Sequence, residues 1–319
     1  MVVIAEVGSN FAGSLEKAKE YVRACKEAGA DVVKFQCWRA EDLLSVHHPA
    51  YGAVKNEVLG LPLEWHPEVK RVADEEGIAF CTTVTQPYQI EKLEEMGVEL
   101  YKVASGDLTF FALLDELNGT EKKVILSTGM ANLSEIEAAL ERLIDCEVVL
   151  MHCVSLYPPD FSEVNLRALE TLMEFFPECE VGISDHTPGF EVAVAALAMG
   201  AGWVEKHVTF SRGLGTPDAP FALEMEELKA MVDVLRRVER ALGDGVKAPS
   251  MRELPERFWA RRGMYAARDM ERGEVLSLSD VVFLRPCKGV PAEAFEAAIG
   301  RRLKRDVSEG EPIGFEDLE

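Results

Sequence analysis

The chain has 319 residues and a formal net charge of −22 at pH 7. A surface this acidic repels nucleic acid and anionic membranes, so we expect neither as a partner. Apolar residues make up 48% and charged residues 28% of the sequence, a balance typical of a globular chain with a large core. A site for an anionic substrate must therefore be a local cluster of Lys and Arg.

The seven cysteines are scattered, odd in number and contain no CxxC pair. This pattern is typical of reduced thiols and not of a disulfide framework or a structural zinc site. The first residues lack the basic segment of a signal peptide, and no apolar run approaches the ~20 residues of a membrane span. We therefore expect a cytoplasmic protein.

Short β-branched segments alternate with amphipathic segments along most of the chain. The expected strands are 2–7, 31–36, 79–84, 100–105, 123–128, 148–153, 181–186 and 203–209. Expected helices include 14–28, 134–143, 188–199 and 224–242. This alternation indicates parallel strands with crossover helices, and eight such units within residues 1–245 predict a (β/α)₈ TIM barrel. An open doubly wound sheet is the alternative, but it would place its ligand at one switch point, whereas here nearly every strand ends in polar residues.

The pattern changes after the last expected barrel helix. The segment 243–255 contains two Gly, two Pro and few apolar residues, which indicates a linker. We assign a barrel domain to 1–245, a linker to 246–256 and a small domain to 257–319. In the last of these, short strands at 264–267 and 281–284 and a short helix near 292–298 predict a compact β-rich module.

In a closed barrel of parallel strands, the active site lies at the C-terminal ends of the strands. Polar, chemically useful side chains occupy most of these ends or the residues just after them. They are Glu6, Lys34, Gln36, Thr82, Thr83, Thr85, Lys102, Ser105, Asp107, Ser127, His152, Ser155, Tyr157, Ser184, Asp185, His186, Glu205, Lys206 and His207. An unpaired buried polar group costs about 1–3 kcal/mol, so a core does not collect so many without a use for them. The set predicts an active site.

Two histidines, His186 and His207, end neighbouring strands. Neutral imidazoles in this position can take one divalent cation. The alternative interpretation is a pair of hydrogen-bonded structural histidines. Two protein ligands would leave coordination positions for water or a substrate oxygen, as a Lewis acid requires.

A second cluster combines two lysines with hydroxyls: Lys34, Lys102, Ser105, Ser127 and Ser184. These groups suit a phosphate and a carboxylate. One alternative is that the lysines extend to solvent. Another is a Schiff-base lysine, as in class I aldolases, which would need neither the histidine pair nor the hydroxyls.

Three carboxylates accompany these cations. Glu6 and Asp107 lie at strand ends, where they can move protons, orient a water or sugar hydroxyl, or balance the charge of a lysine. Asp218 lies in the loop after the last strand, as a turn residue or a substrate ligand.

Strings along the whole chain resemble the N-acetylneuraminate (sialic acid) synthase family. They are Ala-Glu-Val-Gly at 5–8, Ala-Gly-Ala-Asp-Val-Val-Lys-Phe-Gln at 28–36, Tyr-Lys-Val-Ala-Ser-Gly-Asp at 101–107, Ile-Leu-Ser-Thr-Gly-Met-Ala at 125–131, Met-His-Cys-Val-Ser-Leu-Tyr-Pro at 151–158, Gly-Ile-Ser-Asp-His-Thr at 182–187 and Glu-Lys-His at 205–207. The stretches 267–276 and 284–290 resemble the family's antifreeze-like (SAF) domain, a β-clip fold.

The resemblance implies condensation of phosphoenolpyruvate with N-acetylmannosamine or a related amino-sugar aldehyde, giving a nine-carbon 2-keto acid and phosphate. It implies that His186 and His207 hold Mn²⁺ or Mg²⁺. Phosphoenolpyruvate would contact Lys34, Gln36, Lys102, Ser105, Ser127, Tyr157 and Ser184. Around the metal, the water and the sugar would lie Glu6, Asp107 and Asp218. Arg285 would reach the sugar from the C-terminal domain of a partner chain, which implies a domain-swapped homodimer.

Three positions depart from the family pattern. Phe11 replaces a common His, Asp107 replaces a common Glu, and Ser155 replaces a common Asn. These changes leave the acceptor open, so legionaminic, pseudaminic and phosphorylated-mannosamine substrates also fit. A hypothesis from another class is a carbohydrate- or ice-binding protein that uses the barrel as a scaffold, but a scaffold has no need of the histidine pair and the lysine cluster.

Overall fold

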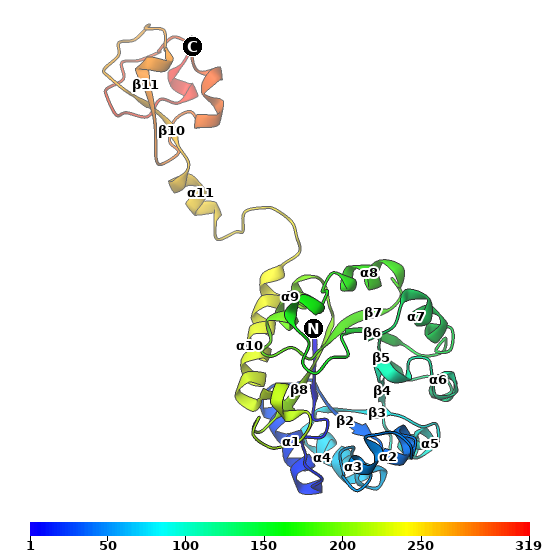
Figure 1. The fold of residues 1–319 in the computed structure, drawn as a ribbon. Coiled ribbons are helices and arrows are strands. Elements are labelled where there is room, and N and C mark those ends of the chain that lie inside the picture. The colour runs from blue at the N-terminus through cyan, green and yellow to red at the C-terminus, as the bar shows by residue number, and fades with distance from the viewer. The chain divides into compact units, whose positions relative to one another are not determined.

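Eight parallel strands of the N-terminal unit close into a barrel (Figure 1). In this computed structural model, which describes residues 1–319, the chain divides into two units, Met1–Gly243 and Asp244–Glu319. The strands are β1 (Val2–Glu6), β2 (Val32–Cys37), β3 (Ala79–Val84), β4 (Leu100–Val103), β5 (Lys123–Ser127), β6 (Val148–Cys153), β7 (Glu180–Asp185) and β8 (Trp203–Thr209). Each pairs with the next, and β1 also pairs with β8, which confirms the predicted TIM barrel.

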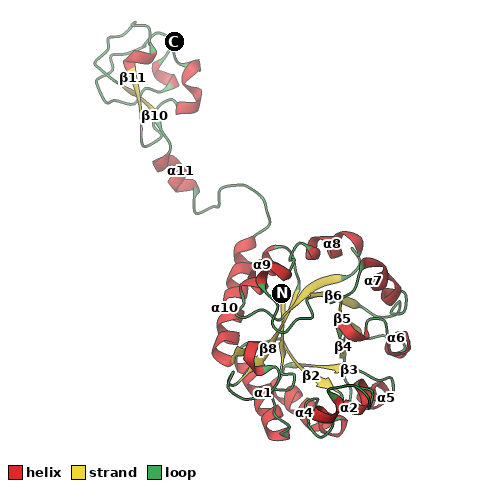
Figure 2. Ribbon diagram, viewed as in Figure 1, coloured by secondary structure: helices red, strands yellow, loops and turns green.

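Helices cover the outside of the barrel (Figure 2). They are α1 (Leu15–Glu27), α4 (His66–Glu76), α5 (Tyr88–Glu95), α6 (Phe111–Asn118), α7 (Leu133–Leu140), α8 (Ala168–Phe175), α9 (Glu191–Ala198) and α10 (Met225–Leu242). Local chemistry sets several of their starts: Ser14 accepts a hydrogen bond from the Lys17 N–H, and Asn132 forms a reciprocal capping box with Glu135. Two short helices, α2 (Ala40–Leu43) and α3 (Tyr51–Val54), lie in the long loop after β2.

The barrel interior changes from apolar to polar along the strands. The apolar part of the interior contains Ile4, Val32, Cys81, Leu100, Ile125, Val149, Met151 and Trp203. Gly182 makes room for this packing, because a Cβ there would lie 2.6 Å from both Met151 Sδ and Trp203 Cβ. Side chains point alternately to the two faces of a strand, so the next inward residue after Ile4 is Glu6, and after Val32 it is Lys34. The strands therefore deliver polar groups to the C-terminal mouth on top of a solid core.

The C-terminal unit has its own small core. Strands β10 (Gly263–Ala266) and β11 (Val281–Leu284) form an antiparallel pair. Buried around them are Met264, Met270, Leu276, Val290, Leu303 and Ile313. A helix that we did not predict, α11 (Leu254–Ala260), crosses the expected boundary between linker and module. The Pro that suggested a linker, Pro255, lies in the first turn of this helix, where the missing N–H costs nothing.

None of the helices combines the length and the apolar character needed to cross a bilayer.

Candidate active site

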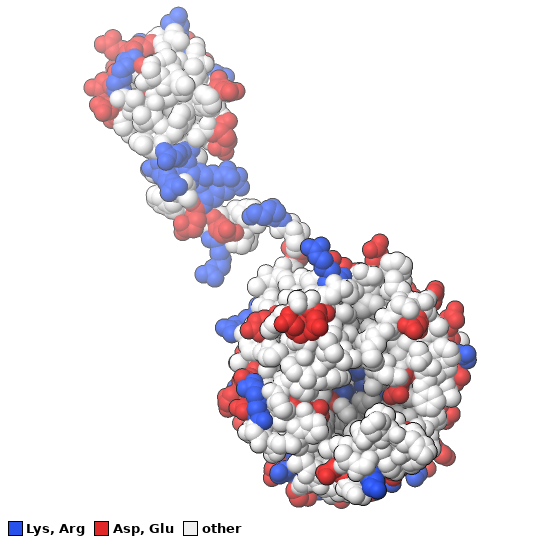
Figure 3. All heavy atoms as spheres, in the orientation of Figure 1, with Lys and Arg blue, Asp and Glu red and all other residues white.

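A cavity of about 240 Å³ opens at the C-terminal ends of the strands. The predicted residues that line it are Lys34, Gln36, Lys102, Ser105, Asp107, Ser127, Tyr157, Ser184, His186 and His207. The space-filling view shows this hollow with basic atoms inside it, on a surface scattered with acidic groups (Figure 3). The structure thus brings most of the predicted set to one place, and their individual roles stay predictions.

Lys34 lies at the centre of a buried charge cluster. Its Nζ is 2.7 Å from Glu6 Oε2 and 3.4 Å from Glu205 Oε1, and it donates to Thr83 Oγ1 at 3.3 Å. Burial alone would lower the pKa of Lys34, but the two carboxylates outweigh this and raise that pKa above its usual value. Lys34 is therefore a permanent ammonium whose charge is already shared with two acids.

Lys102 is the cation that remains free to meet a substrate. It donates to the Ser127 hydroxyl and to Val103 O, and no carboxylate lies within 4.0 Å of its Nζ. Burial lowers the pKa of Lys102, with the charge of Glu205 opposing the shift. An anionic group from a ligand would supply the partner that this ammonium lacks.

Two hydroxyls approach the backbone at Gly129. Ser105 Oγ accepts a hydrogen bond from the Gly129 N–H at 3.1 Å. Ser155 Oγ is buried without a hydrogen-bond partner. A Cβ at Gly129 would overlap the Ser155 hydroxyl and lie 2.7 Å from the Ser105 hydroxyl, so glycine is needed for both to approach. Ser155, which departs from the family pattern, therefore has an open hydrogen-bonding position.

The two buried glutamates have opposite protonation tendencies. Burial raises the pKa of Glu6 to about 7, against the opposing effect of Lys34. For Glu205, burial is outweighed by the charges of Lys34 and Lys102, and its pKa falls to about 2. Ser184 Oγ also donates to Glu205 Oε1 at 3.2 Å. Two acids whose pKa values are pushed apart by their surroundings are the pattern of an acid and base pair.

The histidine pair lies beside these acids. The ring centroids of His186 and His207 are 5.2 Å apart, and the ring of Tyr157 lies against His186 with centroids 4.2 Å apart and a tilt of 46°. Burial, with the neighbouring imidazole, lowers the pKa of His186 to about 3, and burial also lowers the pKa of His207. Both rings are therefore neutral at pH 7, the form that binds metals.

The pair fits a divalent cation. His186 Nδ1 lies 3.1 Å from Val154 O, which orients this ring. His207 Nδ1 is buried without a hydrogen-bond partner. No group of three or more His, Cys, Asp or Glu side chains converges as a complete metal site. A cation here would have two imidazoles from the protein, with its remaining ligands from water or substrate.

Asp218 is tied to the loop after β1 and does not line the cavity. Its Oδ2 accepts from both the N–H and the hydroxyl of Ser9, each at 2.7 Å. It precedes a short 3₁₀ helix but makes no side-chain cap there. Gly8 has φ +54, and a Cβ at Gly8 would overlap the Asp218 carboxylate. The contact with Ser9 thus holds the first and last loops of the barrel mouth together.

The two remaining predicted residues differ in setting. Asp107 lines the cavity, and burial raises its pKa to about 6, with Lys102 opposing the shift. Arg285 is exposed at the end of β11 in the C-terminal unit. Its reach into a partner's site stays a prediction.

The predicted strand-end set also contains Thr83 and Glu205, which line the cavity, whereas sequence reasoning missed Trp38. Glu205 was predictable from strand alternation, because it lies two residues before His207 on the same inward face. Thr83 follows from the same rule on β3. Trp38 comes after the end of β2, where alternation stops, so no sequence signal was available for it.

Comparisons with known proteins place the whole chain among sugar-acid synthases. The sequence model of the NeuB family matches residues 21–247, and that of the SAF domain matches 261–319. An N,N'-diacetyllegionaminic acid synthase of Campylobacter jejuni is 35% identical over 98% of this chain and 98% of its own length. A pseudaminic acid synthase of the same species is 32% identical over 99% and 96%. The crystal structure of an N-acetylneuraminic acid synthetase from Leptospira borgpetersenii, 33% identical, superposes with a TM-score of 0.75 over 80% of this chain and 89% of its own.

Proposed function

We propose that this chain, which belongs to the NeuB family, condenses phosphoenolpyruvate with an amino-sugar aldehyde to give a nine-carbon 2-keto acid and inorganic phosphate. One observation carries the proposal. A single cavity combines a buried ammonium without a carboxylate partner, Lys102, with serine hydroxyls and a pair of neutral imidazoles. That is the arrangement needed to hold a phosphorylated acid next to an activated carbonyl group.

The lysine and serine cluster would bind phosphoenolpyruvate. Lys102 lacks a carboxylate partner, it bonds the Ser127 hydroxyl, and the hydroxyls of Ser105 and Ser184 line the same cavity. Fixed donors of this kind hold the charge of the phosphate and carboxylate without reorganising during the reaction. They also place C3 of phosphoenolpyruvate where it can attack the aldehyde carbon.

His186 and His207 would hold a Mn²⁺ or Mg²⁺ ion, which when bound polarises the aldehyde carbonyl. We expect calorimetry to show tighter binding of phosphoenolpyruvate when Mn²⁺ is present, because the cation offsets the charge of the substrate. The variant His207→Ala should lose this dependence on Mn²⁺ and its chelator-sensitive turnover while staying folded. Equal affinity and turnover in Mn²⁺ and in EDTA would rule out the cation.

Glu6 and Asp107 are suited to the proton transfers. Water adds at C2 of the substrate, the C2–O bond to phosphate breaks, and the proton of that water must leave. Glu6, with a pKa of about 7, can take up or release a proton near neutral pH, and Lys34 at 2.7 Å stabilises its ionised form. Asp107 lies at the cavity wall, where it can orient a sugar hydroxyl or the water.

The test is phosphate release from phosphoenolpyruvate with a panel of acceptors. The panel contains N-acetylmannosamine, its 6-phosphate and the diacetylated hexoses that precede legionaminic and pseudaminic acids. We expect release only when both substrates are present, with one acceptor strongly preferred. If no acceptor of the panel gives phosphate release while the chain still binds sugar, the result would instead support the carbohydrate-binding hypothesis.

Borohydride trapping separates the proposal from the Schiff-base alternative. A lowered pKa and the lack of a carboxylate partner at Lys102 are also properties of a Schiff-base lysine. In the proposed reaction Lys102 and Lys34 stay non-covalent, so borohydride with substrate should leave the mass of the protein unchanged. A reduced adduct on either lysine would assign the protein to the aldolase class.

We further propose a domain-swapped homodimer in the cytoplasm. All seven cysteines are free thiols, as expected in a reducing compartment. If Arg285 completes the partner's site, mixing inactive His186→Ala chains with inactive Arg285→Ala chains should restore up to one working site per dimer. If the chains exchange and activity does not return, Arg285 acts within its own subunit or has no role.

A further inference from the structure

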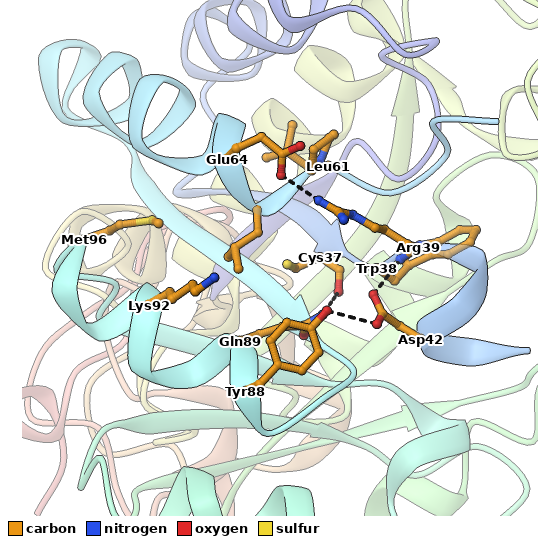
Figure 4. A pocket seen from close by; sticks show the side chains of 12 residues that line it. Cys37, Trp38, Arg39, Asp42, Leu61, Glu64, Tyr88, Gln89, Lys92 and Met96 are labelled. Carbon is orange, nitrogen blue, oxygen red and sulfur yellow. Dashed lines mark hydrogen bonds and ion pairs between the residues drawn. The ribbon is translucent and has the colours of Figure 1, made fainter. Parts of the chain in front are cut away.

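We propose that Trp38 is a positioning residue that fixes the orientation of the Gln36 carboxamide against Glu6. Trp38 lies in the wall between the catalytic cavity and a second cavity of about 220 Å³, the outer pocket (Figure 4). The outer pocket is lined by Cys37, Trp38, Arg39, Asp42, Leu61, Pro62, Leu63, Glu64, Tyr88, Gln89, Lys92 and Met96. The kinetic test of this inference rests on the proposed function, whereas the spectroscopic test depends only on the hydrogen-bond geometry.

A chain of hydrogen bonds runs from the indole to the buried charge cluster. Trp38 Nε1 donates to Gln36 Oε1 at 3.0 Å, and Gln36 Nε2 donates to Glu6 Oε1 at 2.6 Å. The other oxygen of Glu6 lies 2.7 Å from Lys34 Nζ. The indole N–H can only donate, whereas a carboxamide has one accepting and one donating end. Trp38 therefore selects the amide orientation in which the NH₂ group faces the glutamate.

The opposite amide orientation would be unfavourable at both ends. It would place the NH₂ group against the indole N–H and the carbonyl oxygen against Glu6 Oε1. Without the indole donor, only the contact with Glu6 distinguishes the two orientations. The N–H of Trp38 thus helps to keep Glu6 as the hydrogen-bond acceptor.

The indole itself is held by a close backbone approach. A Cβ at Gly60 would overlap the Trp38 carbonyl oxygen and lie 2.8 Å from the indole Cδ1. The next residue, Leu61, donates its N–H to Gln36 O at 2.7 Å, which ties this segment to β2. The backbone at Gly60 and Leu61 therefore holds the indole ring in place at the strand end that carries Gln36.

The other polar groups of the outer pocket are paired among themselves or balanced. Arg39 bonds Glu64 at 2.8 Å, and Tyr88 OH donates to Asp42 Oδ1 at 2.9 Å. Figure 4 shows these pairs on the pocket wall, with Lys92 opposite. Because the outer pocket has two cations and two carboxylates, its charges favour neither an anionic nor a cationic ligand. The group of the outer pocket that reaches the catalytic cavity is the indole N–H of Trp38, which bonds Gln36.

The kinetic test is a double-mutant cycle. Trp38→Phe keeps a ring but removes the donor, so kcat/KM for phosphoenolpyruvate should fall roughly 2- to 10-fold, the loss of one neutral hydrogen bond. In a Gln36→Leu background the same change should have no further effect. An equal factor in both backgrounds would show that Trp38 acts only through packing and would overturn the proposal.

Matched controls separate this effect from general disturbance of the loop. Tyr88→Phe removes a ring-borne donor from the outer pocket outside the catalytic cavity, and kcat/KM should not change. Gly60→Ala should displace the indole and lower kcat/KM, whereas Gly52→Ala, with nothing within 4 Å of the added Cβ, should not. Loss of activity in Tyr88→Phe or Gly52→Ala equal to that in Trp38→Phe would contradict a specific role.

A spectroscopic test needs no turnover. The chain has four tryptophans, so the Trp38 indole N–H signal is the one that disappears in Trp38→Phe. Its exchange with solvent should be roughly 2- to 10-fold faster in Gln36→Leu than in the wild type. Unchanged exchange would overturn the inference even if the proposed reaction is correct. If the wild type turns over no substrate, the proposed function fails, while this measurement still decides the role of Trp38.

Discussion

Behind the histidine pair lies a buried ion pair whose removal we expect to cost several kcal/mol. Lys206 Nζ is 2.9 Å from Asp185 Oδ2 and donates to Thr187 O at 2.6 Å. The two side chains are 1% and 0% exposed. They face outward from the barrel, on β8 and β7, next to His207 and His186 in sequence. The pair therefore joins the two strand ends that carry the imidazoles.

The perturbation is Lys206→Met, which keeps the length of the side chain and removes its charge. Asp185 would keep its hydrogen bonds from the N–H and hydroxyl of Thr187 but would lose its counter-charge. Breaking a buried pair in this way costs about 3–5 kcal/mol. For a folding unit the size of Met1–Gly243, each kcal/mol shifts the Tm by roughly 2–4 °C, so we expect a fall of about 6–20 °C.

Thermal unfolding followed by circular dichroism measures this shift. The double variant Lys206→Met/Asp185→Asn should recover much of the loss, because no net charge then remains buried. A pair at the protein surface is the matched control: Lys70 bonds the exposed Asp74 at 2.8 Å across one helical turn, and Lys70→Met should cost under about 1 kcal/mol. If Lys206→Met and Lys70→Met melt within error of each other, the argument from buried charge is wrong.

Three further predictions concern single residues. Burial lowers the pKa of His66 from 6.5 to about 4, so between pH 6.5 and pH 4 the unfolded state takes up a proton that the folded state does not. The free energy of unfolding measured in urea titrations should therefore fall by up to about 3 kcal/mol over this range, and His66→Gln should flatten the dependence. The pKa of Asp107 is raised to about 6, so kcat/KM should rise with pH through about 6, and Asp107→Asn should remove that limb of the profile. Gly129→Ala should displace the hydroxyls of Ser105 and Ser155 and raise KM for phosphoenolpyruvate roughly 10- to 100-fold in the phosphate-release assay, while KM for the sugar should stay nearly constant.

Strand positions and inward faces were predictable because both follow from local patterns. The expected strands 79–84, 148–153 and 203–209 coincide with β3, β6 and β8. Once a strand is placed, alternation decides which of its residues face inward, so Lys34 and His207 could be assigned to one cavity before any distance was known.

Other features depend on distances between strands and were not predictable. The pKa values of Glu6 and Glu205 shift in opposite directions. Burial outweighs the charge of Lys34 at Glu6, whereas the charges of Lys34 and Lys102 together outweigh burial at Glu205. Trp38 enters the wall through a loop that Gly60 supports from about twenty residues further along the chain. Such contacts follow from the closed fold and have no periodic signature in the sequence.

If the proposed function is correct, the charges of the cavity explain how such an acidic chain would hold an anionic substrate and why a cation would assist it. Lys34 is balanced by carboxylates before any ligand arrives, which leaves Lys102 as the one unpaired ammonium. A substrate with both a phosphate and a carboxylate carries more negative charge than one ammonium and several hydroxyls offset, and burying the excess is costly. Neutral imidazoles at His186 and His207 can bind a divalent cation without first losing protons at pH 7. The histidine pair thus supplies a position for the positive charge that the lysine cluster lacks.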